Sequence, residues 1–290
     1  MSNVTIIYHG ACSDGYTAAY IASMKFSSRA EFLPFTYSQK PPEPESLRGK
    51  QVFILDFCFP AEIMKKICDV AESVTLLDHH ESAKTLLGDF THKNFHKTLD
   101  NTRSGAGIAW DFWFGAESRT KLVKLVEDRD LWKFEFPETN WLYAFMGTFE
   151  FTHDFSQMAA IDRALQNGDL KVLDTGKKLF EASQKQIEKL AKRAWLRTIK
   201  IENQTLTYAM VNCDTNISDV CSKMLANSQA DFAVSYYDTG EEGNPQRRWS
   251  FRSAGKIDVN VIAKKLFGGG GHKAASGAVT DITVGIPEAL

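Results

Sequence analysis

Short apolar runs alternate with amphipathic stretches over the first 150 positions of the chain. The runs at 4–8, 51–57 and 74–77 are rich in β-branched residues and are typical of buried strands, whereas 61–71 has helical spacing. This alternation predicts a parallel sheet covered by helices. Lys40-Pro41-Pro42-Glu43-Pro44 predicts a surface connection, because consecutive prolines exclude both helix and central strand.

The pattern changes in the second half of the chain. Apolar residues recur at helical spacing from about Thr175 to Arg197, which predicts a connector helix. After it we expect strands at 205–211, 232–237 and 249–252, helices at 220–227 and 259–267, and a hairpin-like loop at 239–245. The predicted fold class is α/β, with a mostly parallel doubly wound sheet, a helical connector and a smaller α+β carboxy-terminal domain.

Length and charge narrow the range of partners. Two domains are the natural expectation for 290 residues. The net charge of −2 argues against binding to long duplex DNA, so any nucleic-acid ligand is expected to be short. We recognise neither a signal sequence nor a membrane span, and five cysteines without disulfide spacing fit a reducing compartment. A cytoplasmic protein is predicted, either a monomer or a homodimer.

Residues of metal-binding type follow each of the three apolar runs. His9 and Asp14 follow the first run, Asp56 follows the second, and the third leads into Asp78-His79-His80. Because open α/β sheets hold ligands at the carboxyl ends of their strands, these residues are expected to share one site. Carboxylates with imidazoles suit two divalent cations that clamp a phosphoryl group and acidify a bridging water.

In this order the residues resemble the signature of the DHH phosphoesterase superfamily. The segment Gly268-Gly269-Gly270-Gly271-His272-Lys273-Ala274-Ala275-Ser276-Gly277 is similar to the glycine-rich signature of that family's second domain. The resemblance spans nearly the whole chain. It implies a metal-binding catalytic DHH domain at 1–152, a helical connector at 153–198, a DHH-associated substrate-binding domain at 199–290, and an active site in the cleft between the two domains.

The resemblance also implies the metal ligands. The ligands of one ion are implied to be His9, the residue at position 12 and Asp56, and those of the other Asp14, Asp56, His79 and a further aspartate. Asp56 then bridges the two ions. The further aspartate is Asp128 or Asp130, and the resemblance favours Asp128 because an aromatic residue, Trp132, follows it by four positions.

Position 12 departs from the family pattern, because Cys12 stands where the family has an aspartate two residues before Asp14-Gly15. A thiolate is a softer ligand than a carboxylate and favours zinc or iron over manganese. A buried and inert thiol is an equally open interpretation. The predicted cofactor is two divalent ions, with Mn²⁺ preferred and Mg²⁺, Co²⁺, Zn²⁺ or Fe²⁺ as alternatives.

Two segments are expected to bind substrate. Arg103, Ser104 and Gly105 precede a helical stretch at 108–114, and a helix N-terminus either binds phosphate through its N–H groups or is simply capped by Ser104. The glycine-rich segment, with Gly269, Gly270, Gly271 and His272, lets the backbone approach a ligand closely.

The remaining roles follow from the resemblance. His80 is implied to face the substrate phosphate, with a hydrogen bond to a carboxylate as the alternative. Arg252 is implied to reach the same phosphate, with a surface ion pair as the alternative. His80, Asp56 and Arg252 are therefore the predicted catalytic residues.

The predicted function is metal-dependent hydrolysis of phosphodiester bonds in short oligonucleotides or dinucleotides. A pyrophosphatase or exopolyphosphatase is one alternative. Trp249 and Phe251, which could stack on a base, favour a nucleotide over an all-phosphate substrate. The other alternative is a nucleotide-binding module in which Cys12 has impaired catalysis.

Overall fold

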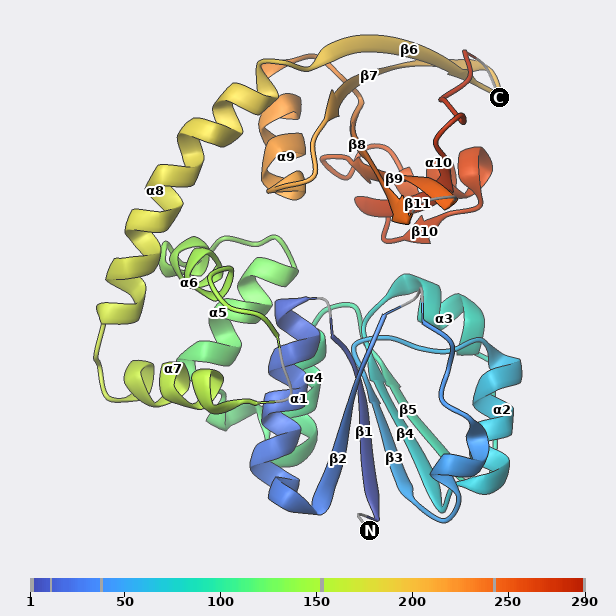
Figure 1. The fold of residues 1–290 in the computed structure, drawn as a ribbon, viewed down its shortest axis with the longest axis vertical. Coiled ribbons are helices and arrows are strands. Elements are labelled where there is room, and N and C mark those ends of the chain that lie inside the picture. Colours follow the sequence, from blue (N-terminus) through green and yellow to red (C-terminus); the bar gives the residue numbers. More distant parts are fainter. Residues whose placement is uncertain (1–2, 11, 37–38, 152–153, 242–243, 289–290) are drawn as a thin grey trace. The chain divides into compact units, whose positions relative to one another are not determined.

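The computed structural model describes residues 3–10, 12–36, 39–151, 154–241 and 244–288 of the chain. Contacts between residues divide the chain into two compact units, Met1–Phe180 and Glu181–Leu290. The division lies inside the long helix α8, Lys171–Ala191 (Figure 1). The domain boundaries expected after residues 152 and 198 remain predictions.

The first unit is built on a five-stranded parallel sheet with the strand order β2-β1-β3-β4-β5. Its strands are β1 (Val4–His9), β2 (Ala30–Phe35), β3 (Gln51–Leu55), β4 (Ser73–Asp78) and β5 (Phe95–Leu99). The three predicted strands are β1, β3 and β4, and β2 and β5 extend the sheet on either side. The chain order reverses between β1 and β3, where open α/β sheets hold ligands.

Helices cover both faces of this sheet (Figure 1). They are α1 (Ser13–Phe26), α2 (Ala61–Val70), α3 (Glu81–Leu87), α4 (Gly105–Phe114), α5 (Lys121–Asp130), α6 (Glu138–Met146) and α7 (Ser156–Gln166), with 3-10 helices η1 (Ser27–Arg29), η2 (Pro44–Leu47) and η3 (Ala116–Ser118). Ile6 of β1 lies in a core with residues of α1 and α4, and the next residue, Ile7, lies in a second core with residues of α2. The doubly wound arrangement is confirmed.

The second unit contains a six-stranded sheet with the order β10-β11-β9-β8-β7-β6. Its strands are β6 (Trp195–Ile201), β7 (Gln204–Asn212), β8 (Phe232–Glu241), β9 (Asn244–Arg252), β10 (Gly270–Gly271) and β11 (Ala275–Asp281), and its helices α9 (Ile217–Asn227) and α10 (Val259–Phe267). Strands β7 and β8 pair in parallel, and the other neighbouring pairs are antiparallel. The predicted α+β carboxy-terminal part is confirmed.

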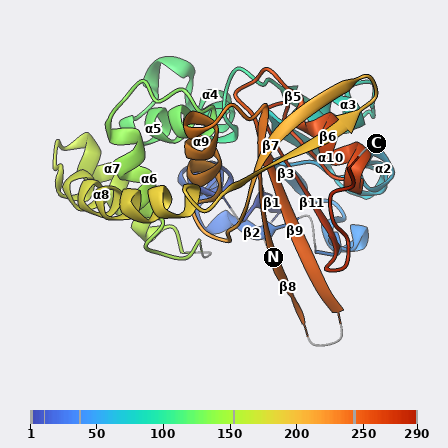
Figure 2. The ribbon, with the colours of Figure 1, turned by 90° about the horizontal axis from the view of Figure 1, so that it is seen from above.

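Two expectations for local structure need correction. The helix expected to reach Arg197 ends at Ala191, and Trp195 already belongs to β6, where it pairs with Met210 of β7. Pairing with a neighbouring strand outweighs helical spacing there. The loop expected at 239–245 is mostly strand, because β8 and β9 pair as far as Glu241 and Asn244 and form a long hairpin (Figure 2). Residues 242–243 of that loop lie outside the described residues.

The described helices were compared with the length and apolar character that a membrane span needs. None of them is both long and apolar enough to cross a bilayer.

Candidate metal centre

The candidate site lies where three neighbouring strands end. His9 is the last residue of β1, Asp56 directly follows β3, and Asp78 ends β4 just before His79 and His80. Asp56 has a φ of 61°, a conformation that residues other than glycine adopt rarely. Such backbone outliers cluster at functional sites, because the surrounding structure must hold them in place.

His9, Cys12 and Asp56 form the first group of potential ligands. Cys12 Sγ lies 3.2 Å from His9 Nδ1 and 3.1 Å from Asp56 Oδ2, and His9 Nδ1 lies 3.6 Å from the same oxygen. Burial and the negative charges of Asp56 and Asp14 raise the pKa of the Cys12 thiol well above its usual range. The thiol therefore keeps its proton, and its S–H donates a hydrogen bond to Asp56 Oδ2.

Asp14, His79 and Asp130 form the second group. His79 Nε2 lies among three carboxylates, 3.1 Å from Asp56 Oδ1, 3.5 Å from Asp130 Oδ2 and 3.9 Å from Asp14 Oδ2. Burial alone lowers the pKa of His79, but its contact with Asp56 and the charges of Asp130 and Asp14 raise it to about 10. Asp56 thus faces the first group with Oδ2 and the second group with Oδ1.

The acidic residues of the second group are crowded. Burial, together with the charges of Asp130 and Asp56, raises the pKa of Asp14 well above its usual range. Desolvation also raises the pKa of Asp130, to about 6, although the charge of His79 lowers it. Burial would raise the pKa of Asp56 as well, but the imidazoles of His79 and His9 hold it well below its usual range.

This donor set fits divalent cations. Asp56 Oδ1 is buried, and the imidazole of His79 contacts it, with Nε2 3.1 Å away. A carboxylate oxygen and an imidazole nitrogen this close together, beside the further acidic groups of Asp14 and Asp130, are atoms that one cation is able to share. Carboxylates with imidazoles are donors that bind divalent metal ions.

The two candidates for the fourth aspartate lie in different surroundings. Asp128 is buried in the last turn of α5, and its carboxylate accepts hydrogen bonds from the N–H of Glu135 at 2.9 Å and from the hydroxyl of Thr139. Asp130 instead places its carboxylate beside His79. Asp128 thus stabilises the turn after α5, and the geometry favours Asp130 as the fourth aspartate. The choice between the two residues stays a prediction.

The N-terminus of α4 binds an anion of the same chain. The N–H of Gly105 donates to Asp14 Oδ2 at 2.6 Å, and the N–H of Ala106 donates to Asp14 Oδ1 at 3.0 Å. Ser104 caps the helix. A Cβ at Gly105 would lie 2.7 Å from Asp56 Cβ, so the site requires glycine at this point. The free N–H groups and the helix dipole therefore hold Asp14 in place.

Arg103 takes part in an ion-pair network beside this helix. Its guanidinium pairs with Asp100 at 2.8 Å and with Asp111 at 2.7 Å, and Asp111 also pairs with Arg119 at 2.6 Å. The Arg103 guanidinium and the N–H groups at the start of α4 were expected to contact substrate phosphate, and they instead donate to acceptors of the same chain. The contact expected for Arg103, Ser104 and Gly105 gains no support from this geometry and stays a prediction.

Asp78 orients both histidines of its motif, a role that the sequence analysis did not give it. Its Oδ1 accepts hydrogen bonds from the N–H of His79 at 2.7 Å and the N–H of His80 at 3.2 Å, and lies 2.7 Å from His80 Nδ1. Burial lowers the pKa of His80, but the bond to Asp78 raises it above the ordinary value. The carboxylate partner considered as the alternative for His80 is therefore present.

Glu127 is a second residue that the sequence analysis missed. Its Oε2 accepts a hydrogen bond from the N–H of Ser104 at 3.0 Å, and its Oε1 pairs with Arg119 at 2.7 Å. Glu127 thus fixes the helix N-terminus that holds Asp14. Helical spacing could have identified Glu127, because Glu127 and Asp130 are three residues apart on α5 and therefore lie on the same face of the helix.

Comparison with known proteins identifies the carboxy-terminal part of the chain. The sequence profile of the DHHA1 domain matches residues 203–290. These residues form a DHHA1 domain. The match confirms the resemblance to the DHH phosphoesterase superfamily. An uncharacterized protein of Acanthamoeba polyphaga mimivirus is 28% identical over 289 residues, which cover 94% of this chain. The chain spans 66% of the length of that relative, just under two thirds.

Three solved structures are similar over most of their length. A protein from Helicobacter pylori is 18% identical with a TM-score of 0.45, and 99% of this chain and 95% of that chain are covered. A pGpG-specific phosphodiesterase from Vibrio cholerae is 15% identical with a TM-score of 0.49, with coverages of 97% and 94%. An exopolyphosphatase-related protein from Bacteroides fragilis is 13% identical with a TM-score of 0.49, with coverages of 95% and 86%. The ligand groups described above are defined by distances within this structure, and they do not rest on any of these similar structures.

The glycine run of the DHHA1 domain has a structural reason at two positions. A Cβ at Gly269 would lie 2.2 Å from the carbonyl oxygen of Gly277, and one at Gly271, where φ is 147°, would lie 2.6 Å from that of Ala275. At Gly270 a Cβ would meet only Asn260 Oδ1, at 3.9 Å. Close pairing of β10 with β11 therefore explains Gly269 and Gly271 without a ligand. The substrate contacts expected for this run and for His272 stay predictions.

Arg252 lies at the end of β9 in the DHHA1 domain. Its Nε and Nη2 atoms contact Ser218 Oγ at 3.2 Å and 3.1 Å, and its Nη1 donates to the carbonyl oxygen of Phe251 at 2.9 Å. These bonds hold the guanidinium against α9. Its contact with substrate phosphate stays a prediction.

The two aromatic residues expected to stack on a base are buried. Trp249 is 3% exposed and Phe251 is 0% exposed. Trp249 stacks on Phe267 of α10 at 4.8 Å between ring centroids. Both side chains belong to the core of the DHHA1 domain, so this support for a nucleotide substrate is withdrawn.

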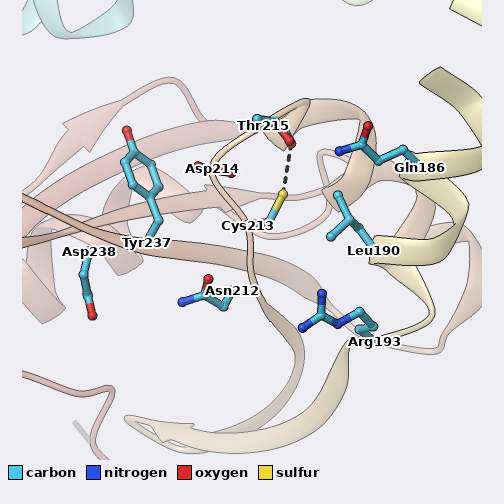
Figure 3. A pocket seen from close by; sticks show the side chains of 9 residues that line it. All are labelled: Gln186, Leu190, Arg193, Asn212, Cys213, Asp214, Thr215, Tyr237 and Asp238. Atoms are coloured by element: carbon cyan, nitrogen blue, oxygen red, sulfur yellow. Dashed lines mark hydrogen bonds between the residues drawn. The ribbon is translucent and has the colours of Figure 1, made fainter. Parts of the chain in front are cut away.

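A separate pocket of ≈ 480 Å³ lies in the second unit (Figure 3). Its lining is mostly polar and comes from α8 and the segment after it, from the end of β7 and the segment after that strand, and from β8: Gln186, Leu190, Arg193, Asn212, Cys213, Asp214, Thr215, Tyr237 and Asp238. The Cys213 thiol donates to the carbonyl oxygen of Thr215 at 2.9 Å. None of the lining residues was expected to serve the metal centre.

The roles of Asp130 and Asp128 predict opposite effects of the same substitution. Asp130→Asn should weaken Mn²⁺ binding by at least about tenfold and leave the thermal stability of the metal-free protein unchanged or higher, because it removes repulsion among acidic groups. Asp128→Asn should lower the free energy of unfolding by about 1–3 kcal/mol and leave Mn²⁺ affinity near normal. Calorimetric titration and thermal denaturation measure both quantities. Reversed effects would restore Asp128 as the ligand.

Glu127 is predicted to support metal binding without touching the ion. Glu127→Ala should weaken Mn²⁺ binding by about 10–100-fold, because the N-terminus of α4 loses the acceptor that fixes it. Glu127→Gln retains an acceptor for the N–H of Ser104 and should restore most of the affinity. Isothermal titration of both variants at a temperature where each is folded makes the comparison. Wild-type affinity in Glu127→Ala would exclude this role.

Proposed function

We propose that the protein is a metal-dependent phosphoesterase that hydrolyses phosphodiester bonds of short oligonucleotides or dinucleotides. One observation carries the proposal: Asp56 faces two groups of ligands with its two carboxylate oxygens. A carboxylate so placed suits a pair of neighbouring cations, which is the arrangement of two-metal hydrolytic sites.

The described residues divide into two shells that share Asp56. His9, Cys12 and Asp56 would hold one divalent ion, and Asp14, Asp56, His79 and Asp130 the other. Bound there, the ions supply the charge that polarises a phosphoryl group and makes a water molecule acidic. Asp14 is kept in position by α4, and His79 by Asp78.

His80 is proposed to contact the substrate phosphate. Asp78 accepts from both its backbone N–H and its Nδ1, so the ring is held in one orientation at the strand end. A fixed imidazole is able to donate a hydrogen bond to a phosphoryl oxygen as negative charge develops there. Arg252 and the glycine run of the DHHA1 domain are proposed, from the resemblance, to bind the same substrate.

The charge around the metal centre favours a phosphodiester over an all-phosphate chain. A polyphosphate carries several negative charges and calls for a dense group of lysines and arginines. The arginines beside α4, Arg103 and Arg119, are already paired with Asp100, Asp111 and Glu127. The oligomeric state and the cytoplasmic location remain predictions.

The first test replaces the shared carboxylate. Asp56→Asn keeps a residue that tolerates positive φ, and it should lower dinucleotide hydrolysis by more than about 100-fold, since even outer partners of metal ligands contribute about 10–100-fold. Asp162→Asn is the matched control, because Asp162 is also buried in the first unit but bonds to Tyr20 and lies outside the ligand groups. Products from a dinucleotide, a longer oligomer, a cyclic dinucleotide and pyrophosphate are separated by chromatography with Mn²⁺ present.

The products obtained from these four substrates distinguish the proposed function from its alternatives. Cleavage of pyrophosphate in preference to every diester would replace the proposal with a phosphoanhydride hydrolase. Binding of the dinucleotide without turnover would replace it with a nucleotide-binding module. Full activity in Asp56→Asn would exclude the metal centre described here.

The second test separates the adjacent histidines. His80→Ala should keep the metal content of the wild type and lower turnover by about 10²–10⁴-fold, as expected for a group that acts on the reacting phosphate. His79→Ala should lose metal from the second group, because its Nε2 lies among the three carboxylates. Elemental analysis beside steady-state kinetics makes the distinction. Loss of metal from His80→Ala would show that His80 is itself a ligand.

A further inference from the structure

We propose that the two metal positions are chemically unequal and that the protein holds a mixed pair of ions. The first group, with the Cys12 sulfur, selects an ion of the Zn²⁺ class, and the second group selects Mn²⁺ or Mg²⁺. This inference rests on the two-metal function proposed above. It goes further by naming which ion belongs to which group of side chains.

The first group has the donor set of a zinc site that keeps an open position. It combines one sulfur, one imidazole nitrogen and one carboxylate oxygen, from Cys12, His9 and Asp56. The three atoms lie within 3.1–3.6 Å of one another, close enough to share one ion after small adjustments. Catalytic zinc sites have three protein ligands of these types and leave the fourth position to water or substrate.

The second group has mostly hard donors. Carboxylate oxygens of Asp14, Asp56 and Asp130 surround a single nitrogen, His79 Nε2. Oxygen-rich sets of this kind suit Mn²⁺ and Mg²⁺, whereas thiolate selects softer ions such as Zn²⁺. The difference between the two groups therefore depends mainly on one atom, the Cys12 sulfur.

Capping of α1 does not by itself account for a cysteine at position 12. Cys12 Sγ does accept from the N–H of Gly15 at 3.2 Å, but the capping position prefers serine, threonine, aspartate or asparagine. The same sulfur contacts His9 Nδ1 and Asp56 Oδ2, atoms that face the first group. When an ion binds, the thiol proton passes to solvent and a metal–sulfur bond replaces the S–H bond, so the thiolate offsets part of the ionic charge.

Cys58 provides a matched control within the same unit. It follows Asp56 by two residues and is 6% exposed, yet it belongs to none of the ligand groups found among the described residues. Cys12→Ser retains an oxygen that caps α1, so it tests the sulfur with little expected effect on folding. Cys58→Ala removes a buried thiol that should have no part in metal binding.

The experiment is titration of metal-free full-length protein with Co²⁺, followed by absorbance. The wild type and Cys58→Ala should show a near-ultraviolet sulfur-to-cobalt charge-transfer band and bind two ions per chain. Cys12→Ser should lose the band and bind Zn²⁺ at the first group at least about tenfold more weakly. In parallel, metal-free protein is loaded with one Zn²⁺ per chain and excess Mn²⁺ and then dialysed, because Zn²⁺ in excess would displace Mn²⁺ from either group. The wild type should retain one ion of each kind, and Cys12→Asp should shift the content toward Mn²⁺.

The outcomes separate this inference from the function on which it rests. Two bound Co²⁺ ions without the charge-transfer band, or a band that persists in Cys12→Ser, would overturn the mixed pair and leave the metal centre intact. Two ions of the same metal in the wild type after dialysis would also overturn it. Failure to bind Co²⁺, Zn²⁺ and Mn²⁺ at all would instead remove the proposed function.

Discussion

The site depends on the cost of holding several carboxylates together away from water. Asp14 and Asp56 are each 1% exposed, and Asp130 shares with them the surroundings of a single imidazole. Ionised carboxylates are expensive to bury unless cations or hydrogen-bond donors offset their charge. The raised pKa values of Asp14 and Asp130 show that the chain's own groups offset it incompletely. Divalent cations would supply the missing positive charge.

The backbone around these carboxylates is shaped to bring them close. The parallel sheet places His9, Asp56 and Asp78 at adjacent strand ends, and the N-terminus of α4 adds two N–H donors to Asp14. A Cβ at Gly15 would lie 2.3 Å from the carbonyl oxygen of His9, so α1 begins this close to β1 only with glycine there. The residues that the fold requires at these positions, such as Gly15, are therefore also the residues that let the carboxylates of the site approach one another.

The sequence predicts the parts of the site that lie at strand ends. Apolar runs followed by His9, Asp56 and Asp78 predict where each strand stops, and the parallel topology then brings those residues together. It does not decide between Asp128 and Asp130, since that choice depends on how α5 is rotated against the sheet. The burial of Trp249 depends likewise on packing against α10, which no local pattern reveals.

The sequence also does not predict which charged residues pair with one another. Arg103 precedes a helix N-terminus, a position typical of a phosphate contact, but its guanidinium pairs with Asp111, eight residues later in the chain. Glu127 reaches Ser104 across two helices, and only the folded structure brings them together. Such long-range polar contacts determine which cations and N–H groups a substrate is able to meet.

In the proposed metal centre, one carboxylate, Asp56, joins two metal ions. Electron paramagnetic resonance of the protein loaded with excess Mn²⁺ tests it most directly, because ions that share a bridging ligand are magnetically coupled. We expect two Mn²⁺ ions per chain and the spectrum of a coupled pair, which Asp56→Asn should convert to the spectrum of isolated ions. A spectrum of isolated Mn²⁺ in the fully loaded wild type would contradict it.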